Sequence, residues 1–213
     1  MNFDRIAPLY SLLEKLAFGE RLHQARTVFI DQVRQAEQIL LVGEGRGRLL
    51  QEILRINPSA VVTVVEHSKR MIKHMQKLKF SHSESRIFYI CSSFWDFESN
   101  KKFDIVYTCF FWDCFEKGEI KTGLKKTSKL LSKSGIWVNV DFASPQAGSF
   151  FLNLYHKVLL NFLYGFFQVS CGLKVNKIIT VSPLAEAEGL KRIEGRKFVS
   201  LPLMSEIFSL SRS

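Results

Sequence analysis

Short apolar runs alternate along the chain with segments in which apolar residues recur every three or four positions. The short runs are typical of strands buried on both faces of a parallel sheet, and the periodic segments are typical of helices that cover it. The last two strands, with a tight turn at Pro202 between them, predict an antiparallel hairpin. The seven predicted strands lie at residues 39–42, 61–65, 87–91, 103–108, 136–140, 191–198 and 204–210.

The periodic segments place helices between these strands. Ser68 is a suitable N-cap for one of them, and Ser182 with Pro183 gives an N-cap followed by a first-turn proline for another. No repeat or flexible linker divides the 213 residues. We therefore expect one α/β domain built on a mostly parallel, seven-stranded sheet. One predicted helix begins near residue 46, and the others lie at 68–78, 120–131 and 182–188.

Two segments flank this alternating pattern. Residues 1–36 carry two helical patterns with a break at Gly19, and we expect them to cover the sheet. Residues 147–173 are rich in phenylalanine and leucine, and Lys157 is the one charged residue between 149 and 172. Polar residues interrupt this second segment too often for a transmembrane span. We expect an apolar helical insertion that covers the acceptor side or faces a membrane.

A glycine-rich turn follows the first strand directly. Gly43, Gly45 and Gly47 allow positive φ and a close approach of the main chain to a ligand, and a helix then points its N–H groups at that ligand. The second strand ends in Glu66, a carboxylate suited to accept hydrogen bonds from ribose hydroxyls. Arg48 stands where a dinucleotide fingerprint has its third glycine, which disfavours NAD. An adenosine ligand of another kind is favoured.

The pattern resembles the class I S-adenosylmethionine (AdoMet)-dependent methyltransferases. The motifs GEGRGR at 43–48, E-x-S-x-x-M at 66–71 and FDRIAPLYSLL at 3–13 are similar to the ubiquinone/menaquinone C-methyltransferase branch and its small bacterial relatives. FFWDCF at 110–115 and the run at 162–173 resemble the same group. The resemblance implies a Rossmann-like fold and AdoMet as cofactor. It implies cofactor contacts by Tyr10, Gly43, Glu44, Gly45, Gly47, Glu66, His67, Ser92, Ser93 and Phe110, with His23 as a further candidate.

The sequence departs from this family at two positions. Ser92 and Ser93 stand where the family carries an aspartate that accepts from the adenine amino group, with Asp96 three residues further on. Leu41 stands where the family often has an aspartate in the first strand, and we expect Glu44 to replace it.

The expected reaction is transfer of the sulfonium methyl group to a small acceptor, for which the protein mainly orients the two substrates. Asp113, Asp141 and His156 are candidates for deprotonating the acceptor. The segment from Phe110 to Asp113 follows the fourth strand at the edge where open α/β sheets bind ligands. Its aromatic residues either pack against the sulfonium or belong to the core at the sheet edge.

Composition bears on partners and compartment. The formal net charge of +10 and the apolar insertion favour a lipophilic or aromatic acceptor and peripheral contact with an anionic membrane. Nucleic acid is disfavoured because no basic stripe alternates with aromatic residues. The N-terminus lacks a signal pattern, so we expect a cytoplasmic protein, peripheral to the inner membrane. We expect it to be a monomer or a homodimer. The four cysteines lack metal-ligand spacing and are expected to be buried thiols, and no metal is expected.

Two other functions stay open at this point. One is a nicotinamide oxidoreductase, which Arg48 opposes. The other is a non-catalytic AdoMet-binding protein associated with a membrane, which Leu41 and Ser93 make credible.

Overall fold

The computed structural model describes residues 19–78, 80, 84–143, 154, 158, 161, 165, 168, 175, 178–198 and 201–211. Its strands form one sheet. They are β1 (Gln38–Val42), β2 (Val61–Glu66), β3 (Ile87–Cys91), β4 (Phe103–Cys109), β5 (Leu131–Phe142), β6 (Leu190–Phe198) and β7 (Leu203–Leu210). The helices and 3₁₀ turns are α2 (Arg21–Thr27), η2 (Ile30–Gln35), α3 (Arg48–Ile56), α4 (Lys69–Met75), η3 (Glu84–Arg86), η4 (Trp112–Cys114), α5 (Lys117–Leu130) and α7 (Ser182–Ala187). The helices predicted over residues 3–18 and most of the 147–173 insertion lie outside the described residues.

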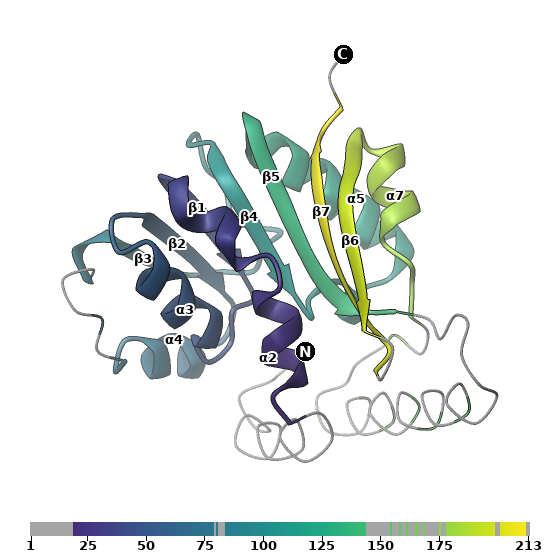
Figure 1. The fold of residues 1–213 in the computed structure, drawn as a ribbon, viewed down its shortest axis with the longest axis horizontal. Coiled ribbons are helices and arrows are strands. Elements are labelled where there is room, and N and C mark those ends of the chain that lie inside the picture. Colours follow the sequence, from purple (N-terminus) through teal and green to yellow (C-terminus); the bar gives the residue numbers. More distant parts are fainter. Residues whose placement is uncertain are drawn as a thin grey trace.

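The strand order is β3-β2-β1-β4-β5-β7-β6. Neighbours from β3 to β5 pair in parallel, whereas β7 pairs antiparallel with both β5 and β6. Helices α2, α3 and α4 cover one face of the sheet, and α5 and α7 cover the other (Figure 1). This arrangement confirms the predicted seven-stranded, mostly parallel sheet with a terminal antiparallel hairpin.

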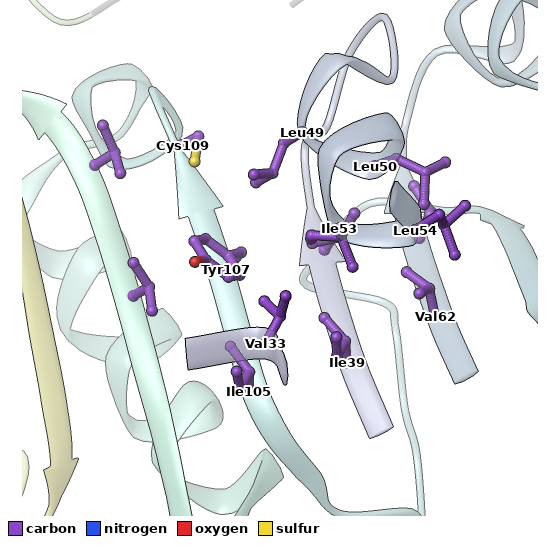
Figure 2. Packing of buried hydrophobic residues seen from close by; sticks show 14 of the residues in the cluster. Val33, Ile39, Leu49, Leu50, Ile53, Leu54, Val62, Ile105, Tyr107 and Cys109 are labelled. Atoms are coloured by element: carbon purple, nitrogen blue, oxygen red, sulfur yellow. The ribbon is translucent and has the colours of Figure 1, made fainter. Parts of the chain in front are cut away.

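Helix α3 is fixed to the sheet by one apolar face. Leu49, Leu50, Ile53 and Leu54 are at most 6% exposed and pack with residues of β1, β2 and β4 in one core cluster. Figure 2 shows Ile53 beside Ile39 and Leu54 beside Val62, while Leu49 extends toward Tyr107 and Cys109 on β4. Burying each such side chain contributes about 1.5 to 3 kcal/mol. The loop between β1 and α3 is therefore held at both ends by well-packed elements.

The segment that precedes the sheet is tied to it by buried hydrogen bonds. The Tyr107 hydroxyl on β4 donates to the Phe29 carbonyl at 3.2 Å, and the Ser205 hydroxyl on β7 donates to the Ala25 carbonyl at 2.8 Å. The Asn57 amide, at the end of α3, donates to the carbonyls of Val33 and Ala36. The described part of the N-terminal segment, α2 and η2, thus lies over the sheet.

A single hydroxyl joins three buried side chains on the opposite face. Thr108 Oγ1 accepts from the indole N–H groups of Trp112 at 3.1 Å and Trp137 at 2.8 Å, and it donates to Asn139 at 3.0 Å. A hydroxyl has one donor and two acceptor positions, and this one uses all three. All four residues are at most 2% exposed. The bonds let two tryptophans enter the core with their polar atoms satisfied.

Several sequence-based boundaries were wrong for identifiable reasons. Helix α3 begins at Arg48 rather than near residue 46, because Gly47 has φ +84° and cannot be helical. Helix α5 begins at Lys117 rather than at 120, because Glu116 and Glu119 form a capping box. Helix α4 ends at Met75 rather than at 78, and β5 begins at Leu131 rather than at 136.

Two other expectations need correction. Ser182 is not an N-cap but the first residue of α7, because its hydroxyl donates to the buried Glu206 carboxylate at 2.6 and 2.8 Å. A charge-assisted bond of this kind is stronger than an ordinary cap. Cys91 is exposed rather than buried because it ends β3, an edge strand, while Cys109 is buried and Cys114 is half-buried. At the other edge, residues 191–197 of β6 are all exposed.

Replacing Thr108 by valine should lower the free energy of unfolding by roughly 2 to 5 kcal/mol, because two buried indole N–H groups lose their acceptor. Thr127→Val is the matched control, since its buried hydroxyl only donates to the Gly123 carbonyl. The control should cost less than about 1 kcal/mol. Urea unfolding of the three proteins measures the difference, and equal losses in both variants would contradict the assigned role of Thr108.

Candidate functional site

The glycine-rich loop lies at the carboxyl ends of β1 and β2. Gly43, Gly45 and Gly47 all have positive φ, between +67° and +84°. A Cβ atom at Gly43 would lie 3.0 Å from the Phe111 ring, and one at Gly47 would lie 2.9 Å from Met75 and Leu78. A Cβ atom at Gly45 would meet nothing within 4 Å. Gly43 and Gly47 are thus required by packing within the protein, whereas Gly45 borders open space that a ligand can enter.

Glu66 ends β2, as predicted, and its carboxylate lies beside Gly45. One carboxylate oxygen accepts from the Gly45 N–H at 3.1 Å, and the other accepts from the Ser68 N–H at 2.8 Å. Burial raises the pKa of Glu66, and the two N–H donors act in the opposite direction. Each carboxylate oxygen can accept a further hydrogen bond. The neighbouring His67 side chain is exposed.

Glu44 has a role that the sequence did not indicate. Its Oε1 accepts from the N–H groups of Leu49 at 2.8 Å and Leu50 at 3.3 Å, which are free donors at the start of α3. The N-cap residue Gly47 has no side chain to accept them. Burial raises the pKa of Glu44 to about 7, although the Arg26 guanidinium acts to lower it. Glu44 therefore anchors the helix and places a second carboxylate in the loop.

Helix α2 contributes a cation to this region. The Arg26 guanidinium carbon lies 4.9 Å from the centre of the Phe110 ring, within the range of cation–π attraction. Phe110 has φ +53°, unusual for a residue with a side chain, and its N–H donates to the Val140 carbonyl at 2.7 Å. Arg26 was missed because it flanks an apolar helical stripe, where a single charge resembles ordinary surface.

His23, a candidate from the sequence, lies on α2 three residues before Arg26. Its Nε2 is 3.7 Å from the Glu52 carboxylate, and burial lowers its pKa. Its Nδ1 is buried without a hydrogen-bond partner. The structure therefore pairs His23 with α3. Tyr10, the remaining candidate in the N-terminal segment, lies outside the described residues.

The turn after β3 brings a carboxylate to the predicted adenine position. The Ser93 hydroxyl donates to the Asp96 carboxylate at 2.6 Å, and the Asp96 N–H points back to the same hydroxyl at 3.2 Å. Ser92 bonds locally, with its N–H directed to the Glu66 carbonyl. Ser93 and Asp96 thus form one polar group beside the end of β2.

Asp113 and Asp141 come together at the carboxyl ends of β4 and β5. Asp141 accepts from the N–H groups of Trp112, Asp113 and Phe142 at 3.1, 3.3 and 2.8 Å. Burial, and then the charge of Asp113, raises the pKa of Asp141 well above its usual range. Burial also raises the pKa of Asp113 to about 6. The two carboxyls titrate as a pair that favours retaining one proton. His156, the third candidate, lies outside the described residues.

The aromatic segment after β4 divides between core and site. Trp112 is fully buried and bonded to Thr108, so the interpretation of this segment as core holds for Trp112. Phe111 is half-buried, and its ring lies against Gly43. It stacks edge-on against Phe94 and Trp112. Across the described ranges, no three His, Cys, Asp or Glu side chains are grouped as metal ligands would be.

Replacing Glu44 by glutamine should make stability less dependent on pH. The pKa of Glu44 is about 7 in the folded protein against 4.5 ordinarily. Between these values the folded chain binds more protons than the unfolded chain, so stability present at low pH is lost as the pH rises. The loss approaches roughly 3 kcal/mol above neutrality.

Urea unfolding at about pH 5 and about pH 8 tests this expectation. From about pH 5 to about pH 8, the free energy of unfolding of Glu44→Gln should rise relative to that of the wild type. A difference between the two proteins that stays constant with pH would mean that Glu44 ionises normally.

Comparison with known proteins gives this geometry a context. Residues 39–135, somewhat less than half of the chain, match a family model described as a methyltransferase domain. No curated protein sequence matches the chain. Many solved structures share its fold.

These structures include methyltransferases. The mitomycin 7-O-methyltransferase MmcR has a TM-score of 0.73 at 14% identity, over 99% of this chain and 61% of its own. Human N-acetylserotonin methyltransferase in complex with SAM has a TM-score of 0.65 at 14% identity, over 97% and 56%. The N-methyltransferase NodS from Bradyrhizobium japonicum WM9, in complex with S-adenosyl-L-homocysteine, has a TM-score of 0.60 at 12% identity, over 90% and 88%.

This chain spans about three-fifths of the first two structures. At these identities the likeness is one of fold. The chain has the seven-stranded Rossmann-like fold of known methyltransferases, and its residues 39–135 match a methyltransferase domain.

Proposed function

We propose that the protein is an AdoMet-dependent methyltransferase that acts on a small lipophilic or aromatic acceptor. The observation that carries the proposal is the juxtaposition of Gly45, which borders open space, with the Glu66 carboxylate 3.1 Å from its N–H. A ligand that enters this space meets a backbone it can approach closely and a carboxylate that accepts from hydroxyls. The matched methyltransferase domain supports the same ligand class.

The residues present suit AdoMet. Glu66 would hold the ribose hydroxyls, and the Ser93–Asp96 pair would accept from the adenine amino group. When bound, the cofactor supplies a methyl group on a sulfonium, which a nucleophile removes. The protein's part is to orient the acceptor and to remove its proton.

Asp113 is the residue best placed to take that proton. Its pKa of about 6 lies near neutrality, where a carboxylate is an effective general base. Asp141 is a positioning residue, because its oxygens accept three backbone N–H groups around Asp113. The similar structures include an O- and an N-methyltransferase, so the proposal leaves the accepting atom open.

The strand order counts against a nicotinamide oxidoreductase. In dinucleotide-binding folds the sixth strand continues the parallel order 3-2-1-4-5-6. Here the antiparallel β7 lies between β5 and β6.

The other alternative, a non-catalytic AdoMet-binding protein, is separated from an enzyme by cofactor consumption. Such a protein would bind the cofactor without consuming it in the presence of cell extract.

A lipophilic acceptor and peripheral membrane contact remain part of the proposal. Leu154 and Val158, one helical turn apart, are 48% and 59% exposed. Together with the net charge of +10, they would favour contact with an anionic apolar surface. In the part of the chain that the structure describes, no helix has the length and apolar content to cross a membrane.

The cofactor assignment predicts that S-adenosylhomocysteine (AdoHcy) binds and that Glu66→Ala weakens its binding by about 1.5 to 3 kcal/mol. Glu66→Gln keeps one acceptor oxygen and should weaken it less. Glu186→Ala, an exposed residue of α7, is the control and should bind as the wild type does. Calorimetry with AdoHcy and NADH decides, and tight NADH binding without AdoHcy binding would reject the proposal.

The membrane contact predicts flotation with anionic liposomes at low salt and release at high salt. Leu154→Asp and Val158→Asp should each reduce the floating fraction, because a charge is placed against lipid. Ile193→Asp is the control, since Ile193 is 58% exposed but lies on β6. Wild type that never floats, or variants that all float equally, would favour a soluble acceptor and no membrane contact.

A further inference from the structure

Helix α5 carries a row of lysines along one exposed side. Lys117, Lys121, Lys125 and Lys129 follow one another at four-residue spacing, and all of them are exposed. Residues four apart lie on the same side of a helix, about 6 Å apart along its axis, so the row is about 18 Å long. No acidic residue occurs between positions 120 and 140. We call these four residues the α5 lysine row.

The α5 lysine row has a rigid support. The helix lies so close to the Trp112 ring that Gly123 has no room for a Cβ atom. Lys102, in the loop before β4, adds a cation at the last turn of α5, where its ammonium group donates to the Lys129 carbonyl. The opposite side of α5 is buried against the sheet through three apolar residues, Ile120, Leu124 and Leu130. The row and Lys102 thus form one continuous basic strip on a fixed backbone.

Helix stability does not account for the α5 lysine row. Lys117 is the first residue of α5, where the helix dipole favours an anion. The successive pairs of like charges, four residues apart, each destabilise a helix slightly. Across the described ranges, no ion pair includes a lysine of α5, whereas carboxylates lie within 3.2 Å of several arginines, namely Arg34, Arg48, Arg55 and Arg192. The lysines of the row are therefore available to attract an external anion.

The kind of anion follows from the residue types. Protein interfaces are depleted in lysine and enriched in arginine and aromatic residues, and sites for single-stranded nucleic acid add aromatic rings on which bases stack. The exposed side of α5 holds neither arginine nor an aromatic residue. An anionic leaflet, in contrast, attracts lysines that come close to its surface and requires no bidentate geometry. The row is therefore complementary in charge to anionic lipid headgroups.

We infer that the α5 lysine row, together with Lys102, is the surface that docks the protein on an anionic lipid leaflet. The inference rests on the membrane contact in the proposed function and deepens it, because it assigns the electrostatic part of that contact to one face of the sheet. A flat leaflet can contact one face at a time, and α5 lies on the face opposite α3 and α4 (Figure 1).

Helix α4 supplies a matched control on the opposite face. Lys69, Lys73 and Lys77 are exposed and have the same spacing as the α5 row, but Lys77 lies beyond the helix, which ends at Met75. Replacing three lysines of either helix region by glutamine removes the same charge. A difference between the two variants therefore reports the position of the charge rather than its amount.

Flotation with phosphatidylcholine vesicles that contain phosphatidylglycerol measures the docking. The α5 variant, with Lys121→Gln, Lys125→Gln and Lys129→Gln, should partition about 10- to 100-fold less than the wild type at low salt. The α4 variant, with Lys69, Lys73 and Lys77 replaced by glutamine, should lose less than about threefold, because charges beyond the screening length contribute little. Vesicles of phosphatidylcholine alone should bind none of the proteins.

Two further measurements separate docking from folding. Replacing the same three α5 lysines by arginine should keep the wild-type partition, because the charge is retained. The α5 glutamine variant should melt no lower than the wild type, since glutamine and lysine have similar helix propensities and like charges have been removed.

The possible results are distinct. Equal losses in the α5 and α4 glutamine variants would show attraction by net charge alone and overturn the inference, while the membrane contact stands. Wild type that does not float would overturn it too, and binding of a single-stranded oligonucleotide that only the α5 variant loses would then assign the row to nucleic acid. Wild type that floats through the row but binds no AdoHcy in calorimetry would support the docking surface and reject the cofactor assignment.

Discussion

Three acidic side chains at the carboxyl edge of the sheet accept hydrogen bonds from backbone N–H groups that have no other partner in a helix or strand. The shape of the candidate site depends on these hydrogen bonds. Glu44 takes two donors at the start of α3, Glu66 takes those of Gly45 and Ser68, and Asp141 takes two in η4 and that of Phe142. An unsatisfied buried N–H costs as much as a lost hydrogen bond. The carboxylates therefore shape the turns of the candidate site.

This arrangement makes the edge acidic in a protein whose formal net charge is +10. Burial raises the pKa of Glu44, Glu66 and Asp141, because charge is costly to place in low dielectric. A ligand with a sulfonium and an ammonium group would relieve that cost, whereas a dinucleotide with its pyrophosphate would increase it. Electrostatics and glycine spacing thus favour the same class of cofactor by independent routes.

The sequence was sufficient for the sheet and for the glycine-rich turn after β1, because buried strands and turn glycines leave local patterns. Glu66 was correctly placed at the end of the second strand, but its hydrogen bond from the Gly45 N–H was not predicted. The cap made by Glu44 and the capping box of Glu116 with Glu119 were not foreseen, since they depend on where a helix begins to within one residue. Arg26 and Thr108 could not be found either, because their partners lie on elements far away in the sequence.

The exposed edge strand β6 bears on how copies of this protein meet. Its sequence from Lys191 to Lys197 is nearly symmetric in charge about Glu194, with Arg192 and Arg196 between. If two copies extended the sheet by antiparallel pairing of these edges, each lysine would face a lysine and each arginine an arginine. Like charges directly opposite one another are destabilising. The charges of this edge therefore oppose its pairing with the same edge of another copy, a route by which open β-sheets aggregate.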